Sequence, residues 1–248
     1  MNEPNEDIIN MDRAELKRLA KNRLRQPQVR SVLMFASLII FLIMGIFFIY
    51  LFSQMMANIS PTATSATIMK QYANSDQQTE AWSWMSNFST MFFIAGLNFT
   101  ALDLVRNKDA KVGFGQTLLR VFNSRYFWLV LGSQILMRLA ISVGTMLLIV
   151  PGIMLQYGLM LVPFVLYDSR EHQSHVDLFK VLADSYRITR GHKFDLFVLQ
   201  LSFLGWYLLG FFTLGVAFIW IYPYTQLTLA AYYEQLRLRY EAAHPQAD

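Results

Sequence analysis

The sequence predicts an all-α integral membrane protein with six transmembrane helices, arranged as three hairpins that are each preceded by a cytoplasmic amphipathic surface helix. Two observations lead to this fold class. Of the 248 residues, 54% are hydrophobic and only 15% are charged, against about 25% charged in an ordinary soluble protein. The basic residues also gather on one side of long apolar runs, which predicts that both termini are cytoplasmic.

Four stretches of the chain carry no charged residue, apart from one arginine, and set the number of crossings. They are 31–69, 81–102, 126–167 and 196–233. A helix needs about 20 apolar residues to cross the core of a bilayer. The first two stretches therefore fit one crossing each, and the last two are long enough for two. Uninterrupted runs of this length exclude a basic soluble protein with a large core.

The predicted crossings are joined by an external loop, two short turns and two linkers. Val150-Pro151-Gly152 and Thr213-Leu214-Gly215 supply the turns, because proline and glycine favour a break between helices. A cytoplasmic segment, 1–30, precedes a membrane domain, 31–248. The crossings are expected at about 31–55, 82–104, 126–148, 152–168, 194–212 and 215–235, with the external loop at 56–81 and the linkers at 105–125 and 169–193.

Lysine and arginine counts give the orientation. Seven lie in the first thirty residues, five in 106–125, five in 168–193 and two near the end, whereas only Lys70 lies in a segment expected outside. By the positive-inside rule both termini and both linkers face the cytoplasm.

A similar unit precedes each pair of crossings. Asp12 and Glu15 form a capping-box pattern ahead of Leu16 and Ala20, which share one helix face. Related patterns occur at 114–122 and 176–186, the last with Ser174 or Asp177 as its cap. Basic residues close each unit and are expected to contact lipid at the surface: Arg25, Arg30, Arg120, Arg125, Arg187 and Lys193.

Three stretches carry a resemblance to a known family. They are ELKRLAKNRLRQ near the start, LLIVPGIMLQYGLMLVPFVLYD, and the run from ADSYRITRGHKFDLF to LTLAAYYEQL. These residues resemble the bacterial integral membrane proteins of domain-of-unknown-function family nine-seven-five. The proline-glycine turn is distantly similar to YciC-type inner membrane proteins and to the membrane domain of some glycerophosphodiester phosphodiesterases. The resemblance implies a multi-pass protein of the bacterial cytoplasmic membrane, and it implies no activity and no catalytic residue.

Arg138 lies near the middle of its predicted crossing and needs an explanation. An arginine at mid-helix costs about 2.5–3.5 kcal/mol on insertion scales, which a dozen apolar neighbours offset. Gln134 and Ser142 follow helical spacing from Arg138, so this stripe is expected to face the interior of the bundle. Gln200 and Gln226 fall at about the same depth, and Arg138 is expected to donate hydrogen bonds to both amide oxygens.

Three interpretations of Arg138 remain open. It belongs to a site for an anionic group, such as a lipid phosphate or a transported anion, or to a set of interhelical hydrogen bonds that only fixes the packing. The third interpretation is that its long side chain extends to the membrane interface.

Other chemistry finds little support in the sequence. The absence of cysteine excludes disulfides, thiolate metal sites and a cysteine nucleophile. The spacing of His172 and His175 fits a solvated loop better than a metal site, and the sequence contains neither a nucleotide-binding loop nor a GxSxG motif. No metal, no cofactor and no catalytic residue is therefore expected.

The composition favours a non-enzymatic protein that binds membrane lipids of the anionic inner leaflet or a membrane partner, with a homo-oligomer as another option and no nucleic acid as a ligand. The alternative is a small transporter or permease subunit for an anionic or amphiphilic solute, centred on Arg138. A lesser alternative is a membrane-embedded enzyme that acts on lipid head groups.

Overall fold

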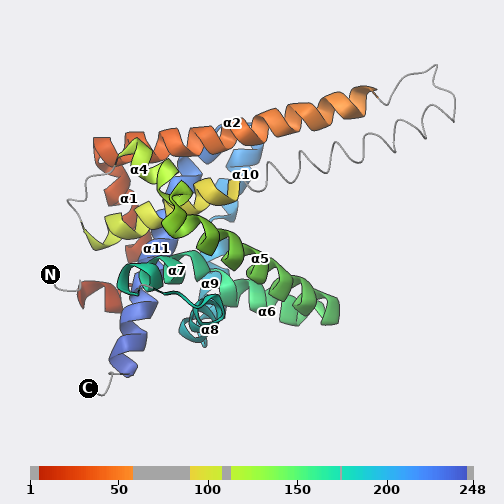
Figure 1. Cartoon of the computed structure of the whole chain (residues 1–248). Coiled ribbons are helices and arrows are strands. Elements are labelled where there is room, and N and C mark those ends of the chain that lie inside the picture. The colour runs from red at the N-terminus through yellow and green to blue at the C-terminus, as the bar shows by residue number, and fades with distance from the viewer. Residues whose placement is uncertain (1–5, 58–89, 108–112, 174, 245–248) are drawn as a thin grey trace.

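The computed structural model describes residues 6–57, 90–107, 113–173 and 175–244, and its regular elements there are all helices (Figure 1). The predicted all-α class is confirmed for these residues. Residues 90–106 form one helix. The other elements are η1 (Glu6–Asn10), α1 (Arg13–Arg25), α2 (Pro27–Ala57), α4 (Phe114–Leu119), η2 (Arg120–Phe122), α5 (Ser124–Leu147), α6 (Ile149–Leu159), α7 (Val162–His172), α8 (Leu178–Ile188), α9 (Lys193–Leu201), α10 (Leu204–Phe212) and α11 (Phe218–Ala243).

Within the described residues, four helical stretches are long and apolar enough to cross a membrane. They are Pro27–Tyr50, Arg125–Leu147, Ile149–His172 and Lys193–Phe212. Large apolar side chains on them face outward, and those of Leu147 and Phe211 are 72% and 74% exposed. Apolar surface of this extent indicates association with a membrane. Most of the predicted external loop, 56–81, and the start of the predicted crossing at 82–104 lie outside the described residues.

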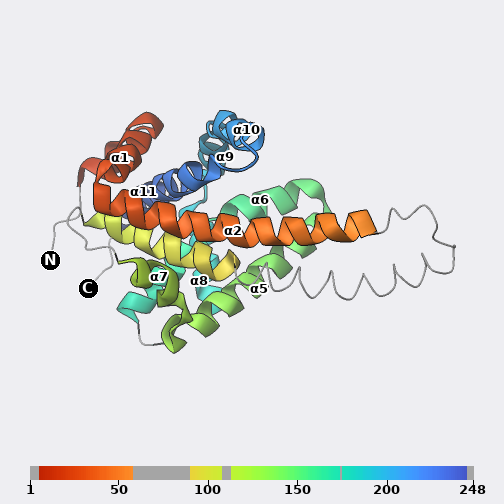
Figure 2. The same cartoon turned by 90° about the horizontal axis from the view of Figure 1, so that it is seen from above.

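The last predicted crossing, 215–235, belongs to α11, which is the central helix of the protein. Its side chains are buried from Leu227 to Leu236, and it packs against η1, α1, α2, α8 and α10. Figure 2 shows α11 between α1 and α2, with the α9–α10 pair toward its other end. The other helices therefore cover most of α11.

The N-terminal segment is fastened to α11. The buried side-chain amide of Gln235 donates to the backbone oxygens of Ile8 and Met11, at 2.9 and 2.6 Å, and Arg239 Nε donates to Ile9 at 2.9 Å. These bonds join the two ends of the chain, which both views place at the end of the molecule opposite the projecting end of α2 (Figures 1 and 2).

Helix α1 begins as the sequence predicts. Glu15 N donates to Asp12 Oδ1 at 2.7 Å and Asp12 N donates to Glu15 Oε2 at 2.8 Å, which completes the capping box. The apolar face was expected to lie on the membrane surface. Instead, Leu16 and Ala20 are fully buried, because α1 packs on α2 and α11.

Helices α5 and α6 lie side by side and are joined at Leu148, close to the predicted break at 150–152. Pro151 and Gly152 are in the first turn of α6, so the chain turns slightly before them. Glycine is required here: a β-carbon on Gly152 would lie 2.8 Å from Thr145 Cα. The close approach of the two helices depends on this missing side chain.

At the second turn, Leu214 and Gly215 adopt positive φ angles of 49° and 90°. Gly215 N donates to the oxygen of Gly210 at 2.8 Å and closes the end of α10. This turn coincides with the break predicted at 213–215.

Candidate functional site

Arg138 lies on α5 with an exposed side chain, and so does Ser142, while Gln134 is half-buried. The sequence predicts that this stripe faces the bundle interior, and for Arg138 and Ser142 that placement is wrong. The buried face of α5 instead contains Val130, Ser133 and Gly144. The small residues Ser133 and Gly144 let α5 approach its neighbouring helices closely, which favours burial of this face over the face that contains Arg138.

The predicted hydrogen bonds from Arg138 to two glutamines are not among those of the described residues. Gln200 accepts from the Tyr207 hydroxyl at 3.4 Å, and its amide lies 3.8 Å from the sulfur of Met160. Gln226 pairs with Tyr222 on its own helix. The five residues predicted as one cluster therefore do not form it, and a separate binding role for Arg138 stays a prediction.

A network of ionised side chains joins three helices at the end of the molecule where the termini lie. Arg106 is the last residue of the buried helix 90–106. It donates to both oxygens of Asp168 on α7, at 2.5 and 2.7 Å, and to Glu234 on α11 at 2.8 Å. The Tyr233 hydroxyl donates to Asp168 at 2.6 Å, and Arg237 pairs with Glu234 at 2.7 Å. Glu234 and Asp168 are only 6% and 13% exposed.

Partly buried charges of this kind need matched partners. Burial alone would lower the pKa of Arg106, but its hydrogen bonds and charge attraction to Asp168 and Glu234 outweigh burial and raise that pKa above the usual value. Arg106 therefore keeps its charge at neutral pH. The network serves as a structural junction, because each charged side chain in it already has a partner.

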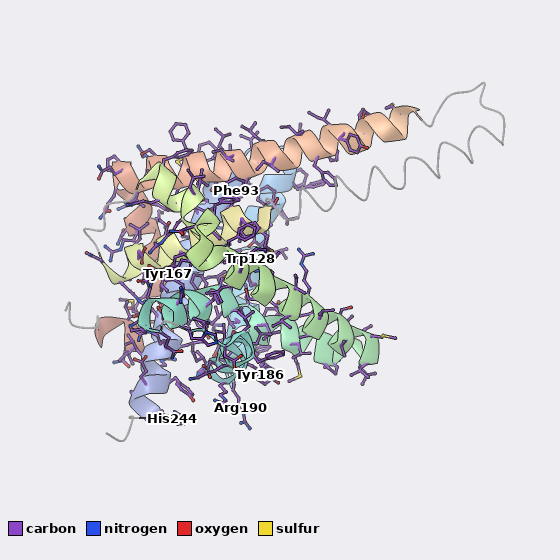
Figure 3. All side chains as sticks on the ribbon, viewed as in Figure 1. Phe93, Trp128, Tyr167, Tyr186, Arg190 and His244 are labelled. Atoms are coloured by element: carbon purple, nitrogen blue, oxygen red, sulfur yellow. The ribbon has the colours of Figure 1, made fainter. Side chains whose placement is uncertain are left out.

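A second group lies beside the junction. Arg120 donates to Asp103 at 2.6 Å and also to the Tyr167 hydroxyl, which donates in turn to Asp103 at 2.9 Å. Burial would lower the pKa of Arg120, yet the bond and charge of Asp103 raise it. The Tyr126 hydroxyl donates to Glu171. Figure 3 labels Tyr167, whose ring stacks on Phe99 with centroids 4.8 Å apart.

This second group lines a cavity of about 730 Å³ between α4, the start of α5 and the end of α7. Its carboxylates already have partners, since Asp103 is held by Arg120 and Glu171 by Tyr126. Arg125 also lines the cavity, is exposed, and forms no ion pair among the described residues. Arg125 is held in position by a 3.3 Å bond to the oxygen of Arg170 and by the ring of Tyr126, 5.8 Å away.

Exposed apolar side chains surround this cavity. Leu119 in its wall is 63% exposed, Phe122 on the next turn is 45% exposed, and Trp128, labelled in Figure 3, is 68% exposed. Arg125 thus presents a guanidinium without an ion pair among the described residues, beside apolar and aromatic side chains. This combination suits the boundary between lipid tails and head groups.

The basic residues predicted to contact lipid have different surroundings. Arg25 and Arg30 are exposed. Arg120 is not available for lipid, because it is partly buried in its pair with Asp103. Arg187 is 64% exposed and 3.5 Å from Asp184, and Lys193 Nζ lies 3.4 Å from the centre of the Tyr186 ring.

Comparison with known proteins finds a similarity over part of the chain. Residues 143–240 match the family model described as "Protein of unknown function (DUF975)". The match covers α6 to α11 except the last residues and includes Asp168 and Glu234, and it assigns no activity. No curated protein and no solved structure matches the chain.

The ion-pair junction was not predicted from the sequence. Asp168 directly follows the stretch 126–167, which is uncharged apart from Arg138, and Glu234 directly follows the uncharged stretch 196–233. Arg106 lies shortly after a third such stretch, 81–102. Acidic and basic residues at the ends of these stretches are the signal that could have predicted the junction.

Proposed function

We propose that this chain is a non-enzymatic membrane protein whose cytoplasmic face binds anionic phospholipid head groups, with six crossings in three hairpins and both termini cytoplasmic. Four apolar helical stretches support membrane association. Helix α11 would cross within the bundle, where its neighbours keep its polar side chains from lipid. The segment 82–104 would supply the remaining crossing.

One observation carries the lipid assignment: Arg125, without an ion pair among the described residues, lines a cavity of about 730 Å³ beside the exposed side chains of Leu119 and Phe122. A phospholipid has a phosphate to match the guanidinium and tails to match the apolar neighbours. Arg120 keeps Asp103 neutralised, which reduces repulsion of an anion in the cavity.

The transporter alternative centred on Arg138 lacks comparable support. An exposed arginine on α5, apart from Gln200 and Gln226, provides no enclosed polar site for a solute. Since this arginine is on the same helix as Arg125, the two residues give a matched pair of variants.

The test is native mass spectrometry of the purified protein titrated with phosphatidylglycerol and, separately, with phosphatidylcholine. We expect wild type to prefer phosphatidylglycerol, and Arg125→Gln to lose about fivefold in affinity for it, since a basic residue near an anionic surface contributes about 1 kcal/mol. Arg138→Gln is the control and is expected to bind as wild type does.

Equal binding of the two lipids by wild type would overturn the proposal. A loss confined to Arg138→Gln would instead favour the transporter alternative. Unchanged melting temperatures in both variants would show that the comparison reports binding and not folding.

A further inference from the structure

A separate cavity lies between the end of α8 and the end of α11, away from the cavity that contains Arg125. Its volume is about 450 Å³. Three arginines and two histidines line it: Arg187, Arg190, Arg239, His192 and His244. No carboxylate is among the described residues of the lining. Figure 3 labels Arg190 and His244, which both lie toward the lower end of that view.

Hydrogen bonds fix both walls of this cavity. On the α8 side, Ser185 Oγ and Thr189 Oγ1 donate to the oxygen of Gly158 at 2.9 and 3.2 Å, which attaches the turn before Arg190 to α6. On the α11 side, Arg239 is held through Nε by Ile9, and the His244 ring stacks on Tyr240 with centroids 4.5 Å apart. The backbone before Arg190, the Arg239 guanidinium and the His244 ring are therefore held in place before any ligand arrives.

Nearby carboxylates neutralise only part of this charge. Asp184 lies 3.5 Å from Arg187, and Asp195 lies 3.4 Å from His192. Arg190 and Arg239 form no ion pair among the residues that the structure describes. Two guanidinium groups that lack a counter-charge thus face a cavity without acids.

A purely structural explanation covers some of these residues. Cations are favoured at helix C-termini, and Arg187 lies in the last turn of α8 while His244 caps α11. The same explanation does not extend to Arg190, which follows the helix, or to Arg239, which precedes the last turn of α11. Arg190 and Arg239 are therefore the basic residues of this cavity that the ends of the two helices do not explain.

We propose that this cavity is a binding site for a phosphate group. Guanidinium donors match phosphate oxygens in pairs, and a volume of about 450 Å³ is within the range of small-molecule sites, about 300–1,000 Å³. The phosphate belongs either to a lipid head group or to a soluble phosphate compound. If the phosphate belongs to a lipid head group, this inference rests on the proposed lipid binding. If it belongs to a soluble compound, the inference is independent of that proposal.

The test is isothermal titration calorimetry of the full-length protein in detergent, with two probes: inorganic phosphate and the short-chain lipid dihexanoyl phosphatidic acid. We expect both to bind wild type, and both to bind Arg190→Gln about tenfold more weakly, because a charged hydrogen bond is lost. Arg18→Gln, which removes an exposed arginine of α1 outside the cavity, is the matched control. Its affinities are expected to equal those of wild type.

Tighter binding of phosphatidic acid than of phosphate would support the proposal with lipid as the source, and equal affinities would support it with a soluble source. If neither probe binds, or if Arg190→Gln and Arg18→Gln behave alike, the proposal is wrong. Preference for phosphatidylglycerol in native mass spectrometry would still stand in that case, so failure of this site and failure of the proposed function are distinguishable.

Discussion

At the scale of single residues, Asp168 links three helices among the described residues. It accepts two hydrogen bonds from Arg106 and one from Tyr233, so it connects the helix 90–106, α7 and α11. Its side chain is only 13% exposed. Without this carboxylate, Arg106 would have to share the single carboxylate of Glu234 with Arg237.

We therefore predict that Asp168→Asn lowers the free energy of unfolding by about 3–5 kcal/mol, the usual cost of breaking a buried ion pair. The measurement is unfolding by dodecyl sulfate in mixed micelles, followed by circular dichroism. Asp184→Asn serves as the control, since the pair of Asp184 with the 64% exposed Arg187 is expected to contribute about 0–1 kcal/mol. Equal losses in the two variants would contradict the role assigned to the junction.

Individual residues also show where sequence reasoning fails. The Asp12–Glu15 capping box was predicted and is present, because a cap depends only on neighbours along the chain. The interior placement of Arg138 was predicted and is wrong, because the buried face of a helix depends on its partners. The buried face contains Ser133 and Gly144, and a hydrophobic pattern does not identify these small residues as buried.

At the scale of elements, the contact between α5 and α6 depends on Gly152. A β-carbon there would lie 2.4 Å from Thr145 Oγ1 and 2.8 Å from Thr145 Cα. The side chain of Thr145 could rotate, but the backbone atom cannot move without separating the helices.

Gly152→Ala is accordingly expected to lower the free energy of unfolding by about 1–3 kcal/mol, as overpacking does. Gly205→Ala on α10 is its control, because a β-carbon there meets no atom within 4 Å. Alanine at that position should leave stability unchanged or raise it by up to about 1 kcal/mol. The same unfolding assay compares the two, and a neutral Gly152→Ala would rule out the close packing of α5 on α6.

The element η1 depends on one side chain of another helix. Gln235 donates to Ile8 and Met11 from within α11, where it is buried. Gln235→Leu removes these bonds, so we predict faster amide hydrogen exchange in residues 6–11, measured by mass spectrometry. Exchange in α5 is the internal reference and should not change. Equal protection of η1 in wild type and variant would mean that other contacts hold it.

At the scale of the whole molecule, the sequence predicted the all-helical class because hydrophobic runs and helical periodicity are properties of the chain alone. It did not predict that α11 is central. The stretch 196–233 was predicted to form two membrane crossings because it lacks charge, but a stretch without charge is not always apolar. Tyr222, Thr225, Gln226 and Thr228 give α11 a polar character that suits a helix enclosed by protein.

The proposed lipid binding requires that the chain is embedded in a membrane with its linker 169–193 and both termini on the cytoplasmic side. Since the protein has no cysteine, single cysteines at Gln173 and at Ser65 can be labelled in cells with a maleimide that does not cross membranes. We predict that Ser65→Cys reacts in intact cells and that Gln173→Cys reacts only after the membrane is permeabilised. Reaction of Gln173→Cys in intact cells would contradict the predicted orientation of the chain. It would also contradict the placement of both cavities on the cytoplasmic side.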